Sequence, residues 1–146
     1  MYFVDREKIE KTLLFYEENL QLIVAANSSW TSVVEKKALE RICHLTIEAI
    51  LDVGNSMIDG FIMRDPGSYE DIIDILEDEK VVTTEVANEL KEIIRFRKVI
   101  VQDYLEINHD ELILSLQKNK ESLASFPQAV RSYLENELGP VSAFKN

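Results

Sequence analysis

The sequence has few residues that break helices or cross-link a chain. Its 146 residues include four glycines, three prolines and one cysteine. So few breakers, together with abundant Leu, Ile, Glu and Lys, favour helix over sheet. A lone cysteine, Cys43, excludes an internal disulfide framework and a cysteine-rich zinc site. We therefore expect an all-α protein of a reducing compartment that holds no metal and no cofactor.

The sequence also lacks a long apolar run and an excess of basic charge. No uninterrupted apolar stretch approaches the roughly 20 residues that span a bilayer, and the first residues do not have the layout of a signal peptide. We expect a cytoplasmic protein with no membrane attachment. The 16 basic and 27 acidic residues give a net charge of -11. This balance argues against broad electrostatic attachment to nucleic acid, but it leaves room for a small basic site.

What the sequence does contain is a series of amphipathic helical patterns within a length that fits one domain, residues 1–146. Capping and turn residues give their limits, and Pro127 is expected to interrupt the chain before the last helix. Short connections between long helices favour an antiparallel bundle. The predicted helices run from Asp5 to about Ala26, from Ser32 to about Phe61, from Ser68 through Leu76, from Thr84 to about Leu105, from Asn108 or Asp110 through Leu116, and from Gln128 to Leu138.

A cluster of cations interrupts the apolar pattern between Arg95 and Tyr104. Arg97 falls in the middle of an apolar helical stripe. Burying an unpaired guanidinium costs several kcal/mol, roughly, so Arg97 must reach solvent, meet a carboxylate or line a polar site. The stripe consists of Leu90, Ile93, Ile94, Ile100, Val101 and Tyr104.

The predicted helix 32–61 offers a partner for this arginine. Asp52 lies in an apolar row there, so we predict that Asp52, together with Glu48, pairs with Arg97. The pair either orients Arg97 beside a polar cleft or forms a structural bridge between two helices. A second apolar row on the same helix predicts that it is central in the bundle or also forms a dimer surface.

Helical geometry divides the polar residues of the cationic segment into two strips. On an ideal helix Arg97 and Tyr104 project about 20° apart, whereas Arg95, Lys98 and Gln102 share a neighbouring strip. Cations, an amide and a tyrosine hydroxyl suit the recognition of a phosphate and a base edge. The alternative is a solvated basic edge beside a core tyrosine.

These residues resemble the HepT-like branch of the HEPN superfamily. The signature of that branch is an arginine, four to six residues, a histidine, one residue and a tyrosine. The resemblance covers roughly residues 5–116 and leaves 117–146 as a helical C-terminal extension. It implies a HEPN-like helical bundle. The segments that carry it are Glu40–Arg41, Ile47–Ala49, Asp52–Asn55, Tyr69–Leu90 and Phe96–Tyr104.

The resemblance implies a function and two partners. Members of this branch form homodimers whose paired signature helices line a cleft, and characterised members are toxins that cleave RNA without a metal ion. Their usual antitoxin is a small nucleotidyltransferase that can attach adenylate to the signature tyrosine. By resemblance, Arg97, Tyr104 and the position of Gln102 are the catalytic signature. The cationic strip predicts that Arg95 and Lys98 bind substrate, and the predicted supporting residues are Asp52, Glu48 and Asn55.

Gln102 departs from the signature because it stands where the family has histidine. Histidine exchanges a proton near neutral pH, whereas glutamine cannot titrate. His109 is the nearest imidazole in the sequence; it either substitutes for the missing base or lies in a connection, while His44 lacks the further ligands of a metal site. Two hypotheses stay open: a toxin-type ribonuclease weakened or altered by Gln102, or a noncatalytic bundle that binds RNA, a nucleotide or a protein.

Overall fold

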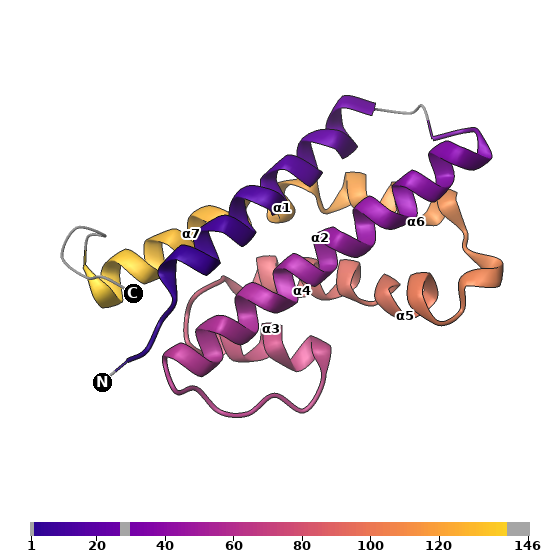
Figure 1. The fold of residues 1–146 in the computed structure, drawn as a ribbon. Coiled ribbons are helices and arrows are strands. Elements are labelled where there is room, and N and C mark those ends of the chain that lie inside the picture. The colour runs from indigo at the N-terminus through magenta and orange to yellow at the C-terminus, as the bar shows by residue number, and fades with distance from the viewer. Residues whose placement is uncertain (1, 27–29, 140–146) are drawn as a thin grey trace.

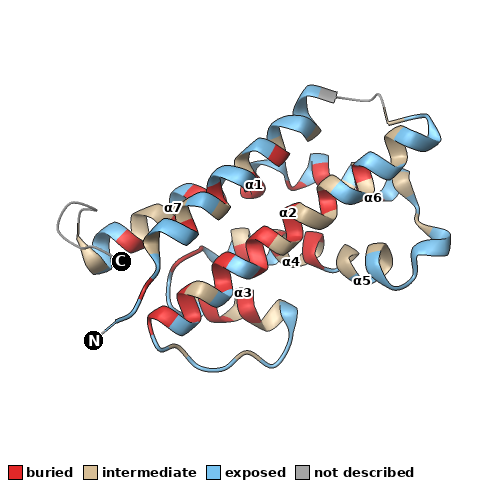
Figure 2. Cartoon of the chain, in the orientation of Figure 1, coloured by how far each residue is buried: buried red, intermediate tan, exposed pale blue. Residues whose placement is uncertain are grey.

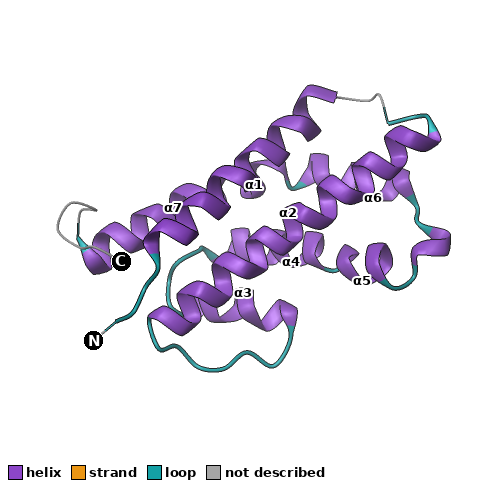
Figure 3. Ribbon diagram, viewed as in Figure 1, coloured by secondary structure: helices purple, strands orange, loops and turns teal. Residues whose placement is uncertain are grey.

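The computed structural model describes residues 2–26 and 30–139, and the regular elements of this part of the chain are all helices (Figure 3). The all-α prediction is therefore confirmed. None of the helices within these ranges is long and apolar enough to cross a membrane. The elements are α1 (Arg6–Ala26), α2 (Val33–Gly60), α3 (Tyr69–Asp78), α4 (Thr84–Ile94), α5 (Phe96–Val101), the 3-10 turn η1 (Tyr104–Glu106), α6 (His109–Lys118) and α7 (Lys120–Leu138).

Local capping chemistry starts several of these helices where the sequence predicts. Ser32 and Glu35 form a reciprocal capping box at the start of α2, with backbone to side-chain distances of 2.9 and 3.1 Å. Ser68 caps α3, and Asn108 caps α6. Each cap satisfies a backbone N–H that has no partner within its own helix.

The two long helices α1 and α2 lie side by side and antiparallel, and α7 runs along α1 while α3 packs against α2 (Figure 1). The start of α1 and the end of α7 meet, because the Arg6 Nη1 donates a hydrogen bond of 2.8 Å to the Gly139 carbonyl. This arrangement is the predicted antiparallel bundle.

Helix α2 lies in the centre of the bundle with its second apolar row buried, whereas the row that contains Asp52 is mostly exposed or half-buried (Figure 2). Its Gly54 allows α3 to approach closely, since a Cβ atom there would lie 2.4 Å from the Ile72 Cγ2. Cys43 is also in this core, and burial raises the pKa of its thiol to about 12. Core packing therefore sets the distance between α2 and the first turn of α3.

The predicted break at Pro127 is wrong, because α7 continues through this residue from Lys120 to Leu138. Proline has no N–H to donate to the carbonyl four residues earlier, which belongs to Leu123. In the structure the Tyr16 hydroxyl donates to that carbonyl at 2.6 Å. A buried side chain from α1 thus replaces the missing helical hydrogen bond, and one reason for a break disappears.

The predicted helix 84–105 is also wrong in its extent. It is divided at Arg95 into α4 and α5, and α5 ends at Val101. At this end the Lys98 carbonyl accepts hydrogen bonds from the N–H groups of both Gln102 and Asp103, at 2.8 and 3.1 Å. The regular hydrogen-bond ladder stops there, and Tyr104 belongs to η1. The ideal-helix angle between Arg97 and Tyr104 therefore does not apply.

Candidate functional site

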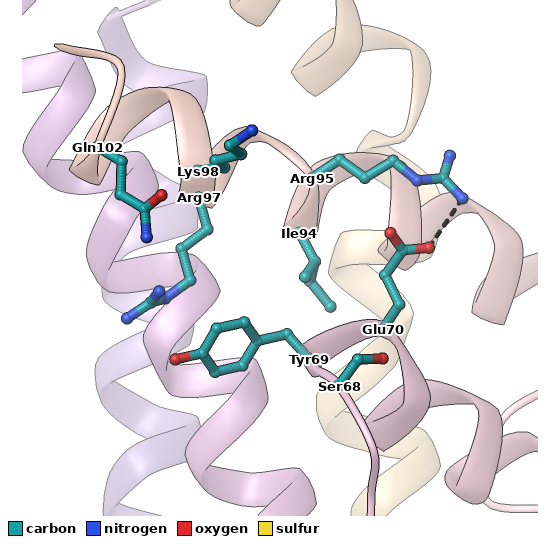
Figure 4. Close-up of a pocket in the computed structure, with 8 residues that line it drawn as sticks. All are labelled: Ser68, Tyr69, Glu70, Ile94, Arg95, Arg97, Lys98 and Gln102. Carbon is teal, nitrogen blue, oxygen red and sulfur yellow. Dashed lines mark hydrogen bonds and ion pairs between the residues drawn. The ribbon is translucent and has the colours of Figure 1, made fainter.

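A pocket of about 500 Å³ lies where the start of α3 meets the end of α4 and all of α5 (Figure 4). We call it the Arg97 pocket. Its volume falls within the range of about 300–1,000 Å³ that is usual for small-molecule sites. It brings together four predicted site residues, Arg95, Arg97, Lys98 and Gln102. The complete lining is Ser68, Tyr69, Glu70, Ile94, Arg95, Arg97, Lys98 and Gln102.

Arg97 is held from two sides. Its Nε donates a hydrogen bond of 2.6 Å to the Glu48 Oε1 on α2, and its guanidinium carbon lies 4.4 Å from the centre of the Tyr69 ring. The hydrogen bond that Arg97 donates to Glu48 raises the pKa of the guanidinium. With 21% of its side chain exposed, Arg97 is neither buried without a partner nor free in solvent. The predicted meeting with a carboxylate of helix 32–61 is therefore observed.

The carboxylate that meets Arg97 is Glu48, and the prediction of Asp52 as its partner is wrong. Asp52 is exposed and has no hydrogen bond to Arg97. It lies one turn further along α2 and lines a separate depression of about 290 Å³ between α1 and α2. Asn55, predicted as supporting, is also exposed and does not line the Arg97 pocket. Glu48 and Asp52 lie on nearly the same face of α2, so the point along α2 at which α5 packs decides which carboxylate Arg97 meets.

The other two cations of the pocket differ in their surroundings. Arg95 donates a hydrogen bond of 2.9 Å to the Glu70 Oε1, and this ion pair forms one wall of the pocket (Figure 4). Lys98 has no carboxylate within 4.0 Å among the described residues. Gln102 lies on the same side of the pocket as Lys98 and Arg97 (Figure 4). Lys98 therefore supplies the cation that no neighbouring carboxylate compensates.

Tyr104 does not join this lining, which corrects the prediction that it shares a strip with Arg97. It is 59% exposed, so the alternative of a core tyrosine is wrong as well. Its neighbours Val101 and Leu105 are 37% and 89% exposed. The end of α5 and η1 together form an apolar surface beside the pocket, with a tyrosine hydroxyl open to solvent.

Neither histidine lines the Arg97 pocket. The His109 Nε2 lies 2.7 Å from the Glu40 Oε2, which ties the start of α6 to α2. The His44 Nε2 lies 3.5 Å from the same Glu48 oxygen that accepts from Arg97. Within the described residues, no group of three or more His, Cys, Asp or Glu side chains could hold a metal ion.

Three residues of the lining, Ser68, Tyr69 and Glu70, were not predicted from the sequence as pocket residues. They lie about 25 residues before the cationic segment and on another helix. In the sequence, Ser68 could be recognised only as a helix cap, and Tyr69 did not belong to an apolar helical pattern. The one available sign was that Tyr69 begins a segment already noted as resembling the HepT-like branch.

Comparison with known proteins defines the class to which this fold and pocket belong. The model of the family "Ribonuclease HepT-like" matches residues 8–130, which contain the whole Arg97 pocket and reach further towards the C-terminus than the predicted range 5–116. The chain therefore belongs to the HepT-like ribonuclease family. The recognition made from its cationic segment is confirmed.

Individual relatives agree with this assignment. The chain is 58% identical over 145 residues to the Bacillus subtilis (strain 168) protein named "Putative RNase YutE", covering 99% of this chain and 100% of that protein. The solved structure of the cytosolic protein YutE from Bacillus subtilis superposes with a TM-score of 0.94, at 58% identity and with coverage of 99% and 100%.

More distant structures share the fold. A toxin-antitoxin complex with AMP-PNP contains a chain with a TM-score of 0.80 and 17% identity, covering 87% of this chain and 99% of that one. A tri-AMPylated Shewanella oneidensis HEPN toxin bound to its MNT antitoxin gives a TM-score of 0.72 and 20% identity, with coverage of 86% and 95%. At these identities the likeness shows a HEPN helical fold.

Proposed function

We propose that this protein acts on or binds RNA at a homodimer cleft, with RNA cleavage weakened or lost because Gln102 stands where the family has histidine. The observation that carries this proposal is the state of Arg97. Its Nε is engaged by Glu48, while Nη1 and Nη2 have no hydrogen-bond partner among the described residues. A guanidinium fixed in this way presents two donors to a phosphate.

The charges around Arg97 also suit a phosphate. Glu48 and Glu70 compensate Arg97 and Arg95, and Lys98 adds one uncompensated cation in an otherwise acidic protein. Such a site attracts an anion locally although the net charge is -11. We therefore assign Arg97 as the phosphate clamp, with Lys98 and Arg95 as substrate-binding residues.

Proton transfer is the weak step of this scheme. The pocket lining includes no histidine, and the Gln102 amide donates and accepts hydrogen bonds but does not titrate. A positioned general base contributes about a hundredfold to ten-thousandfold to such a reaction. Cleavage by this chain must then depend on positioning and charge stabilisation by Arg97, without a metal ion.

The apolar surface at the end of α5 supports a second copy as partner. An exposed leucine and valine beside a substrate pocket are better explained by an interface than by solvent contact. We propose that two copies meet here and that their pockets share one cleft. The exposed Tyr104 hydroxyl would then lie at the cleft, where it can orient RNA.

A small nucleotidyltransferase antitoxin is the second proposed partner, acting in the cytoplasm. The solved HEPN toxin of Shewanella oneidensis is tri-AMPylated and in complex with an MNT antitoxin, and YutE is described as a cytosolic protein. The 59% exposure of Tyr104 makes its hydroxyl accessible to such an enzyme.

The second candidate function is a noncatalytic bundle that binds RNA, a nucleotide or a protein. The absence of an imidazole from the pocket lining favours it over the enzyme. It uses the same Arg97 and Lys98 contacts, so binding alone does not separate the two candidates.

Cleavage assays on purified wild type, Arg97→Ala and Gln102→His test the proposal, with transfer RNA and messenger RNA as substrates and EDTA present. Arg64→Ala is the matched control, because it removes an arginine whose carboxylate partners lie outside the pocket lining. We expect slow cleavage by the wild type, none by Arg97→Ala, and an increase of about a hundredfold in Gln102→His.

The outcomes separate the candidates. Cleavage by the wild type that disappears in Arg97→Ala but persists in Arg64→Ala contradicts the noncatalytic candidate. Cleavage only in Gln102→His contradicts an active wild-type enzyme. RNA binding that is unchanged in Arg97→Ala contradicts both, and a strict monomer at micromolar concentration in sedimentation removes the shared cleft.

A further inference from the structure

Tyr69 offers an open aromatic surface inside the Arg97 pocket. The residue is 51% exposed although it lines the pocket, and its hydroxyl has no hydrogen-bond partner among the described residues. The Arg97 guanidinium covers one side of the ring, with its carbon 4.4 Å from the ring centre. A half-exposed tyrosine ring beside an arginine is suited to binding a planar ligand, because both groups have planar faces that can stack.

The surroundings of this ring match the parts of a nucleotide. Tyr69 supplies a flat apolar face, and the largely buried Ile94 also lines the pocket (Figure 4). Arg97 lies on the opposite side of the pocket from the pair formed by Arg95 and Glu70, and Lys98 lies between them (Figure 4). A ligand with one aromatic ring and one phosphate would contact both kinds of surface at once.

We propose that the Arg97 pocket seats one unpaired nucleotide, with its base stacked on the open surface of Tyr69 and its phosphate against Arg97 and Lys98. This inference rests on the proposed function and makes it more specific. Every base has a face that can stack, so this pocket would accept single-stranded RNA with little preference for sequence. A base within a duplex is already stacked and cannot enter, and Tyr69 therefore selects unpaired positions.

The fixed position of Arg97 explains why the ring and the cation can act together. Glu48 holds the Nε at 2.6 Å and Tyr69 supports one face of the guanidinium, so the two terminal nitrogens stay beside the ring. Fewer side-chain conformations are lost when the phosphate binds, because the arginine is already ordered. Tyr69 thus has two separable effects, one on the base and one on the orientation of Arg97.

Titration calorimetry with two small probes separates these effects. AMP carries a base and a phosphate, and ribose 5-phosphate carries the same phosphate without a base. The wild type is compared with Tyr69→Phe, which keeps the ring, and with Tyr69→Leu, which removes it. We expect Tyr69→Leu to weaken AMP binding by about ten- to a hundredfold and ribose 5-phosphate binding much less, because the second probe reports only the effect on Arg97. Tyr69→Phe should keep the binding of both probes.

Equal weakening of both probes by Tyr69→Leu would overturn the inference, because Tyr69 would then act only through Arg97. AMP that fails to bind the wild type at millimolar concentration would overturn it too. A single-stranded RNA 12-mer and its duplex are titrated in parallel. They show whether only the stacking on Tyr69 fails or whether the proposed RNA binding fails as well. If Arg97→Ala abolishes binding of the 12-mer while Tyr69→Leu leaves it unchanged, the proposed RNA binding is supported and the proposed base stacking on Tyr69 is contradicted.

Discussion

Arg131 and Arg97 are both held by glutamates of a neighbouring helix, but they differ in how many donors remain free. Arg131 on α7 makes four hydrogen bonds of 2.7–3.1 Å to the carboxylates of Glu10 and Glu17 on α1, and they engage its Nε and both terminal nitrogens. Arg97 makes one, through its Nε. The first arginine is satisfied by the protein itself, whereas the two terminal nitrogens of the second have no hydrogen-bond partner within residues 2–26 and 30–139.

Each arginine has a tyrosine nearby in the fold, and the tyrosines show the same contrast. Tyr16 is fully buried, donates its hydroxyl to the Leu123 carbonyl and packs edge-on against Phe126. Tyr69 is half exposed and its hydroxyl has no partner among the described residues. Residue type alone therefore does not separate a structural site from a binding site. The number of unused hydrogen-bonding groups does, since a stable core satisfies nearly all of them.

The largest difference is expected between the two tyrosines. Tyr16→Phe leaves the Leu123 carbonyl buried without a donor and should lower the free energy of unfolding by about 1–3 kcal/mol. Tyr69→Phe loses only a hydroxyl without a protein partner, and its effect should stay within about 0.5 kcal/mol. Urea unfolding followed by circular dichroism measures both. Equal losses in the two variants would contradict the assignment of Tyr16 as the donor that permits Pro127 within α7.

A smaller difference is expected between the two arginines. Arg131→Ala breaks four hydrogen bonds and leaves two carboxylates close together, so it should cost about 1–2 kcal/mol, a value reduced by the partial exposure of all three side chains. Arg97→Ala breaks one hydrogen bond and should cost less than about 1 kcal/mol while it abolishes RNA binding. Thermal unfolding of both variants tests this order. A larger loss of stability in Arg97→Ala would make Arg97 primarily a structural bridge.

The smallest expected effect is the dependence of stability on acid. Hydrogen bonds from Arg131 lower the pKa of Glu17 below its ordinary value. Because the pKa is lower in the folded protein than in the unfolded chain, this contribution is present above about pH 4.5 and is lost as the pH falls through the folded value. Melting temperatures measured from pH 6 to pH 3 should therefore fall less steeply in Arg131→Ala. An unchanged slope would show that Arg131 does not perturb this carboxylate.

Much of the fold follows from patterns that are local in the sequence. Ser32 and Glu35 define the start of α2 because the groups that cap each other are three residues apart. The break expected at Pro127 failed because the missing donor comes from Tyr16, more than a hundred residues earlier. Local rules place helix ends correctly when all the interacting groups are near in the chain.

Part of the candidate site was predictable because it depends on residues that are close together in the sequence. Arg97 stood out because a charged group in an apolar stripe must find a partner in any fold. The selection of Glu48 over Asp52 depends on the point along α2 at which α5 packs, and core packing decides this position. Tyr69 was not predicted because its role arises only from the meeting of α3 with α5. The division at Arg95 and the end of α5 at Val101 are likewise properties of the folded chain.

By itself, the sequence determined a helical bundle, its main caps and the cationic segment that carries the family signature with glutamine in place of histidine. These features depend on backbone propensities and on residue identity, which act over a few positions. The tertiary structure alone decided which carboxylate meets Arg97, that Tyr104 lies outside the pocket lining, and that Tyr69 stands beside the Arg97 guanidinium. Those outcomes depend on side chains brought together from separate helices, and only the packing of the core sets their distances.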